Sequence, residues 1–253
     1  MEQKRIKKRS HILQISYTIL ATLCVPLNLL YFTFFNSMLS ENTMETMSED
    51  TIESAIANLS VAYFILSAIY VSVLIILAIL NITQSFQACH ERETLFCING
   101  MLILKYGMVI FFIVNFFSIA LMLFGISLSG LLISHGTLII ATPVLLPFFF
   151  TVISVLGFIT WLAMLPGSFF AVQVIRFSYS EKKIGMAAAF CHGLLQFFFL
   201  TDVLDTMYLS VKKWGMGKKS SIVIALIYTL GLALPIWTGI KISEILASAP
   251  LGY

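Results

Sequence analysis

Residues 59–83 form an apolar stretch without a charged side chain, and they decide the fold class. They read LSVAYFILSAIYVSVLIILAILNIT, inside a longer uncharged segment that runs from residue 54 to residue 90. A helix needs about 20 mostly apolar residues to cross the hydrocarbon core of a bilayer, which is ~30 Å thick. Runs such as Val71–Ile79 do not alternate between apolar and polar residues, as the strands of a membrane β-barrel would. The stretch therefore predicts a transmembrane helix.

The composition of the whole chain agrees with a membrane location. Of its 253 residues, 59% are hydrophobic and 11% are charged, whereas an ordinary soluble domain is about 45–50% apolar and about 25% charged. So few charged residues cannot cover a water-facing surface, which excludes a soluble enzyme, and the chain is too apolar to be disordered. We therefore expect an all-α, multi-pass integral membrane helix bundle that forms one domain over residues 1–253.

Three further uncharged stretches are long enough to cross a membrane: residues 10–40, 106–175 and 220–240. The longest of them, residues 106–175, has room for two spans joined by a short turn. A bilayer forces each span to be helical, because unpaired backbone groups are too costly in lipid. The five predicted spans cover approximately residues 12–35, 59–83, 102–127, 142–174 and 222–240.

The distribution of lysine and arginine predicts the orientation, because positive residues gather on the cytoplasmic side of membrane proteins. The N-terminal tail is basic, whereas residues 36–54 hold acidic residues and no lysine or arginine. We assign Arg92 and Lys105 to the connection after the second span. The first apolar run is too long for a signal peptide and lacks a small-residue cleavage site, so we interpret it as a retained span. We expect a cell-membrane protein with a cytoplasmic N-terminus.

Residues 184–211, IGMAAAFCHGLLQFFFLTDVLDTMYLSV, are ambiguous. The segment is apolar enough for a sixth span, but both of its flanks are basic and favour the cytoplasm. Asp202 and Asp205 would each cost about +2.5 to +3.5 kcal/mol at the centre of a spanning helix. The segment is an interfacial amphipathic helix, a re-entrant pair broken near Thr201, or a sixth span. We favour five spans plus a membrane-associated amphipathic segment, which leaves every lysine and arginine except Lys241 inside.

The same segment carries the polar residues with the strongest case for a functional role. A charged residue within a membrane is a functional-site hypothesis, and two neighbouring carboxylates resist losing both protons. On a continuous helix His192 and Gln196 share a face with Asp202 beside them, while Asp205 falls on the far side. We predict a candidate ion, proton or substrate site formed by Asp202, Asp205, His192 and Gln196. Alternatively, both aspartates face the cytoplasm on an interfacial helix.

Small residues recur at every fourth position in Gly185, Ala189 and Gly193. Small residues at this spacing let two helices approach closely in a membrane. We therefore predict that this face packs against a neighbouring helix.

No spacing in the chain matches a known catalytic or metal-binding motif. Cys89 and Cys97 lie near acidic residues and a histidine, which are zinc-compatible ligands, but their spacing fits no standard site. The zinc-protease, dinucleotide-binding and phosphate-binding motifs are absent. We expect no metal, no cofactor, no structural disulfide and no enzymatic activity.

These observations leave two main functional hypotheses, since a third, a membrane-embedded enzyme, needs lipid-facing polar chemistry that these residues do not supply. The first is a binding or structural membrane subunit without catalytic activity, whose partners are the lipid bilayer and another membrane protein or a second copy of the chain. The second is a small ion- or proton-coupled transporter that uses Asp202 and Asp205 as ligands, with His192 and Gln196 lining the route. We expect no nucleic-acid partner, because the basic N-terminal residues are explained by anchoring at the cytoplasmic face.

Overall fold

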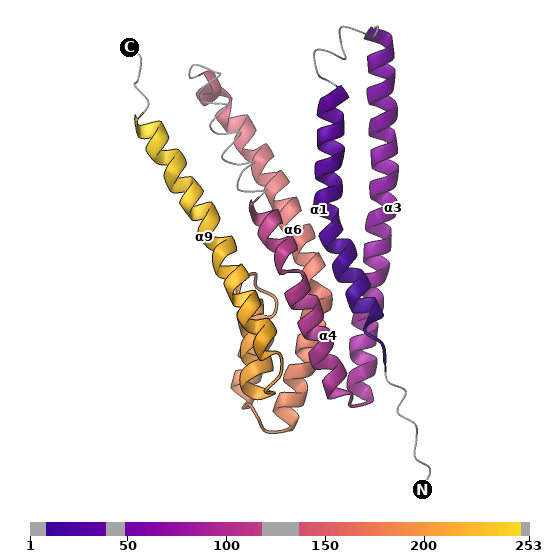
Figure 1. The fold of residues 1–253 in the computed structure, drawn as a ribbon, viewed down its shortest axis with the longest axis vertical. Coiled ribbons are helices and arrows are strands. Elements are labelled where there is room, and N and C mark those ends of the chain that lie inside the picture. The colour runs from indigo at the N-terminus through magenta and orange to yellow at the C-terminus, as the bar shows by residue number, and fades with distance from the viewer. Residues whose placement is uncertain (1–8, 39–48, 118–136, 249–253) are drawn as a thin grey trace. The chain divides into compact units, whose positions relative to one another are not determined.

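The chain is helical wherever its structure is described. The computed structural model describes residues 9–38, 49–117 and 137–248, and these ranges contain no strand. A further helical stretch, residues 109–117, follows α4 after a turn at Met108. The all-α class is thereby confirmed. The other helical elements are α1 (Ile12–Met38), α3 (Glu49–His90), α4 (Thr94–Gly107), α6 (Thr137–Ser180), α7 (Met186–Leu195), α8 (Thr201–Met207), the π-helix η1 (Tyr208–Lys213) and α9 (Lys218–Ser248) (Figure 1).

Five of the helices in the described ranges are long and apolar enough to cross a membrane, as the sequence predicts. The helices extend beyond several of the approximate predicted spans. The third candidate span begins at Thr94, before residue 102, and the fourth helix runs on to Ser180, past residue 174. An apolar run marks the part of a helix that fits the hydrocarbon core, whereas the helix itself ends where the backbone turns. Residues 118–127 of the predicted third span lie outside the described residues. The candidate spans are Ile12–Phe35, Ser54–His90, Thr94–Phe117, Ile153–Ser180 and Lys218–Lys241.

The contacts between residues divide the chain into two compact units. Unit 1 comprises residues 1–108 and 165–177, and unit 2 comprises residues 109–164 and 178–253. Helix α6 therefore contributes residues 165–177, near its C-terminal end, to unit 1 and its other residues to unit 2.

In unit 1, helices α1 and α3 lie side by side and antiparallel (Figure 1). Polar side chains act as connectors between the two apolar helices, a common device in membrane bundles, where apolar surfaces gain little by leaving lipid. The hydrogen bonds run from Tyr63 to Asn28 (2.6 Å), from Tyr70 to the carbonyl of Leu20, from Asn81 to the carbonyl of Leu13 (3.2 Å) and from Gln14 to Gln84 (2.7 Å).

The N-terminal tail is fastened to the turn between α3 and α4. Arg9 forms an ion pair with Glu91 (2.7 Å) and another with Glu93 (3.4 Å). The ring of His11 stacks on Phe96, with ring centroids 4.5 Å apart. Burial lowers the pKa of His11, which favours the neutral imidazole against the aromatic ring. The start of α1 and the start of α4 are therefore held at the same end of unit 1.

The core of unit 1 also contains a close approach between α4 and the middle of α6. A Cβ atom added to Gly100 would lie 2.6 Å from Cε1 of Phe170. Phe170 is fully buried, so its ring has little room to move away. This contact requires glycine.

In unit 2, residues 109–117 connect to both α6 and α9. The side-chain amide of Asn115 donates to the hydroxyl of Thr160 in α6 (2.5 Å). A Cβ atom added to Gly231 in α9 would lie 2.5 Å from Cδ1 of Ile113. One helix is thus joined to α6 by a polar contact and to α9 by close packing.

Residues 184–211 form two short helices instead of one long helix. Helix α7 ends at Leu195, and α8 begins at Thr201 and continues directly into η1. A helix of 10 residues such as α7 is ~15 Å long, about half the thickness of the hydrocarbon core. A sixth span as one continuous helix is therefore wrong, whereas the predicted break near Thr201 is present.

We expect Gly100→Ala to destabilise the protein by about 1–3 kcal/mol, because the added methyl group overpacks a rigid site against Phe170. Thermal unfolding of the purified protein in detergent measures the effect. Gly157→Ala in α6 is the matched control, since a Cβ atom added there has no neighbour within 4 Å. Equal melting temperatures for the two variants would contradict the close approach.

Candidate functional site

The site begins with the break between α7 and α8, where the backbone reverses. Leu200 has a positive φ of 73°, which an L-residue adopts at a cost, and it stands directly before the first residue of α8. The hydroxyl of Thr201 lies 3.2 Å from the carbonyl oxygens of both Leu195 and Phe198. The indole nitrogen of Trp161 in α6 donates to the carbonyl of Phe197 (3.1 Å). Carbonyl groups that the break releases from helical bonding therefore find side-chain partners.

The reversal brings Asp205 against α7. One carboxylate oxygen of Asp205 contacts Nδ1 of His192, and the other accepts a hydrogen bond from the side-chain amide of Gln196 (2.5 Å). On a continuous helix Asp205 would point away from both residues, so that part of the prediction is wrong. The helix break changes the geometry, because it lets α8 fold back until its carboxylate faces the residues on α7.

The interior of this hairpin is polar. Asp202 and Asp205 are only 2% and 6% exposed, and Gln196 is fully buried. Thr206 and Ser210, which follow on α8 and η1, are fully buried as well. Both aspartates are therefore covered by other parts of the chain, which argues against the alternative in which they face the cytoplasm. The four predicted site residues share one hairpin, and the structure directly joins three of them: His192, Gln196 and Asp205.

The outer surface of the hairpin is apolar. Met186, Phe190 and Leu194 recur at every fourth position of α7 and are 77%, 67% and 50% exposed. Phe198 at the break and Leu204 on α8 are exposed too. An arrangement with polar groups inside and apolar groups outside suits a hydrocarbon environment better than water.

A chain of side chains extends the His192–Asp205 pair. The ring of His192 stacks on Tyr208 with centroids 5.4 Å apart, and the ammonium group of Lys213 lies 5.5 Å from the centroid of the Tyr208 ring. An imidazole bonded to a carboxylate through Nδ1 has its orientation fixed.

The two ends of the hairpin segment are tied together. The indole nitrogen of Trp214, just after η1, donates to the hydroxyl of Ser178 at the end of α6 (2.8 Å). The ammonium group of Lys183 lies over the Trp214 ring, 3.1 Å from its centroid. The end of α6 and the start of α9 therefore lie close together (Figure 1). Sequence analysis missed this contact, although a tryptophan between two basic segments was a visible signal.

The stripe of small residues on α7 stays a prediction. Gly185 is exposed, and a Cβ atom added to Gly185 or Gly193 would meet nothing within 4 Å in the described chain. Ala189 is half-buried. Among the described residues, no side chain therefore fills the space beside these two glycines.

Lys105 is a functional candidate that sequence analysis placed wrongly. We assigned it to a connection, but it lies within α4 and is 2% exposed, and its ammonium group donates to the hydroxyl of Ser168 in α6 (2.9 Å). A Cβ atom added to Gly167 would lie 3.2 Å from the stem of Lys105, so the missing side chain makes room for it. The sequence did contain a signal for this burial, which is a single charged residue inside an apolar run. A helix can continue through a lysine when the lysine has a buried partner.

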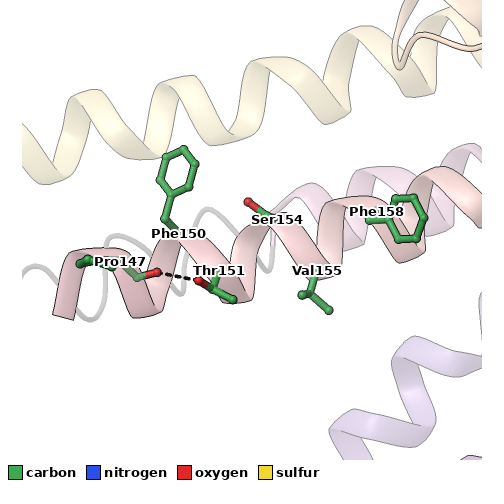
Figure 2. Close-up of a pocket in the computed structure, with 6 residues that line it drawn as sticks. All are labelled: Pro147, Phe150, Thr151, Ser154, Val155 and Phe158. Carbon is green, nitrogen blue, oxygen red and sulfur yellow. Dashed lines mark hydrogen bonds between the residues drawn. The ribbon is translucent and has the colours of Figure 1, made fainter. Parts of the chain in front are cut away.

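Metal-ligating side chains and surface hollows do not point to a second site among the described residues. The described residues contain no group of three or more histidine, cysteine or acidic side chains that fits a metal ion. Figure 2 shows an apolar hollow whose lining residues all belong to α6, so it is a shallow surface of one helix. The lining residues are Pro147, Phe150, Thr151, Ser154, Val155 and Phe158.

The comparisons with known proteins give a family. No curated protein and no solved structure matches the chain. Residues 16–215 match the model of a family described as "Family of unknown function (DUF6652)". The matched region includes α3, α4, α6 and the whole α7–α8 hairpin, and it ends before α9. Because the match covers most of the sequence, the chain belongs to the DUF6652 family.

Proposed function

We propose that the chain is an integral membrane protein of the cell membrane with five spans, a cytoplasmic N-terminus and a re-entrant hairpin at residues 184–211. The five long apolar helices support the spans. The contact between Trp214 and Ser178 supports the hairpin, because a segment whose ends meet enters and leaves on one side. Both basic flanks of the hairpin then lie in the cytoplasm, as the excess of positive residues there requires.

The ion pairs of Arg9 support the same orientation. Arg9 belongs to the basic N-terminal tail, and its partners Glu91 and Glu93 lie in the turn after the second candidate span. Two spans return the chain to the side on which it started, so the tail and this turn share the cytoplasmic face.

The orientation can be measured with a cysteine at Ser220 in a chain whose four native cysteines are replaced. We expect an impermeant thiol reagent to label this cysteine only after the cells are permeabilised. A cysteine at Ser48, in the acidic segment assigned to the outside, is the control and should be labelled in intact cells. Labelling of Ser220→Cys in intact cells would overturn the re-entrant hairpin and require a sixth crossing.

Within this topology, the function that the hairpin supports best is that of a binding or structural membrane subunit without catalytic activity. One observation carries this proposal: Asp205 of α8 binds two polar side chains of the facing segment. Both carboxylate oxygens of Asp205 bond within the hairpin, to His192 and Gln196. Polar groups that satisfy each other in this way hold a fold together and need no substrate. The partner that fits is a membrane protein or a second copy of the chain, seated on the small-residue stripe of α7.

We expect Gly193→Leu to disrupt the assembly while leaving the fold of the chain intact. A larger side chain at Gly193 meets no atom of the chain itself within 4 Å of its Cβ, but it would push a partner helix away. Light scattering after size-exclusion chromatography in a mild detergent gives the assembly mass. Gly157→Leu is the matched control, because its Cβ position is equally open. A wild-type chain that is strictly monomeric would overturn the subunit proposal.

A second candidate function, proton-coupled transport, is favoured by a specific observation. An imidazole and a buried carboxylate, those of His192 and Asp205, are in direct contact inside a hairpin with an apolar exterior. Buried ionisable pairs of this kind form proton relays in membrane pumps and transporters.

Proteoliposomes that contain a pH-sensitive dye separate the two functions. If the chain couples transport to protons, a membrane potential changes the internal pH, and both Asp202→Asn and Asp205→Asn abolish the change. If the hairpin is structural, wild type moves no protons, and Asp205→Asn lowers only the melting temperature, because the new amide group faces a hydrogen-bond donor. Glu244→Gln is the control, since this exposed carboxylate pairs only with Lys241 among the described residues. Proton flux that survives both aspartate substitutions would exclude them as the coupling groups.

A further inference from the structure

Closure of the hairpin segment gathers lysines from two parts of the chain. Trp214 binds Ser178 and lies under Lys183, so residues 182–183 and residues 212–214 meet at one end of unit 2. The turn at residues 215–217 uses positive φ angles at Gly215 and Gly217 (67° and 70°) and leads directly into α9 at Lys218. Lysines that are 30 or more positions apart in the sequence therefore share one small region.

Four of these lysines face outward, and we name them the lysine cluster: Lys182, Lys212, Lys218 and Lys219. Two others nearby are committed to contacts within the chain. Lys183 pairs with Glu181 (2.9 Å) as well as with the Trp214 ring, and Lys213 lies over Tyr208. In the described part of the chain, no member of the cluster takes part in an ion pair.

Few negative charges oppose the cluster. Between residues 178 and 219 the only acidic residues are Glu181, Asp202 and Asp205. Glu181 is paired with Lys183, and the two aspartates are buried inside the hairpin. The outward charge of this surface is therefore strongly positive.

The cluster lies directly beside apolar surface. Met186 at the start of α7 and Ile222 and Val223 in the first turns of α9 are all more than half exposed. In a membrane these side chains face lipid, and the lysines next to them reach toward the headgroups on their long stems. Trp214, which has an apolar ring and a polar N–H group, is a side chain typical of that depth.

The region also has a recess next to Lys182, the first member of the cluster. A shallow hollow at the end of α6 is lined by Tyr179, Ser180, Lys182, Lys183, Ile184 and Gly185. Ammonium and hydroxyl groups are donors that suit phosphate oxygens.

From this arrangement we propose that the lysine cluster is a binding surface for anionic phospholipid headgroups of the cytoplasmic leaflet. The inference rests on the proposed topology, which places the cluster at that leaflet. Basic clusters of this kind next to a membrane segment attract anionic lipids by about 1 kcal/mol per lysine, or about fivefold in binding each. A lipid fits better than a soluble anion, because its acyl chains bury against the exposed apolar residues beside the cluster.

The test compares the binding of two brominated lipids to the full chain in dodecyl maltoside, read from the quenching of tryptophan fluorescence. We expect phosphatidylglycerol to bind at least about tenfold more strongly than phosphatidylcholine, with the preference falling as salt is added. The triple variant Lys182→Gln, Lys212→Gln and Lys218→Gln should lose about tenfold or more of this preference. Lys4→Gln, Lys7→Gln and Lys8→Gln together make the matched control, with the same loss of charge elsewhere, and should retain it.

Three results would overturn the proposal. Equal binding of the two lipids by wild type would show that the surface does not select anionic headgroups. Equal losses of the lipid preference in the two triple variants would show that the net charge of the protein attracts the lipid and that the lysine cluster is not a binding site. Displacement of phosphatidylglycerol by millimolar inorganic phosphate would show a site for a free anion. Labelling of a cysteine at Ser220 distinguishes the causes of failure, because cytoplasmic labelling with no lipid preference refutes the lipid surface and leaves the topology standing.

Discussion

Polar side chains in this protein have to find partners within the fold, because the outer surfaces of its helices are apolar. Exposed leucine and isoleucine side chains cover α1, α3 and α9, while three glutamines, one asparagine and one lysine lie buried among the described residues. In water this distribution would be unstable, but in hydrocarbon it is the favourable one, since an unpaired polar group there costs several kcal/mol. The connectors between α1 and α3 and the contact between Lys105 and Ser168 both follow from this constraint.

The hairpin at residues 184–211 meets the same constraint at a break in the backbone. A helix that stops inside an apolar environment leaves carbonyl groups without partners. Here Thr201 and Trp161 bind carbonyl groups of the break, and Asp205 binds both polar side chains of α7 that face it. Asp205, one of the two aspartates that make a continuous span costly, thus joins the two short helices that fold against each other. Because both aspartates are buried, the hairpin is a packed structural element of the fold.

The two functional candidates differ in what Asp205 does with its proton and its lone pairs. In a structural subunit, the carboxylate serves only to join α8 to α7. In a transporter, the same contact with His192 would store a proton between two binding events. The geometry favours the structural subunit, because Asp205 makes its bonds within the hairpin. The transporter stays a candidate because Asp205, which contacts His192, is an ionisable residue buried in the hairpin.

The helical class, the number of long apolar helices and the region in which the polar residues gather can all be predicted from the sequence. These properties depend on composition and on the length of uncharged runs, which the thickness of a bilayer makes decisive. Which residues meet depends on how the chain folds. Asp205 faces His192 because the chain reverses at Leu200, and Lys105 is buried because Ser168 and the space at Gly167 accommodate it. Such contacts join residues far apart in the chain, and helical periodicity carries no information across a break in the helix.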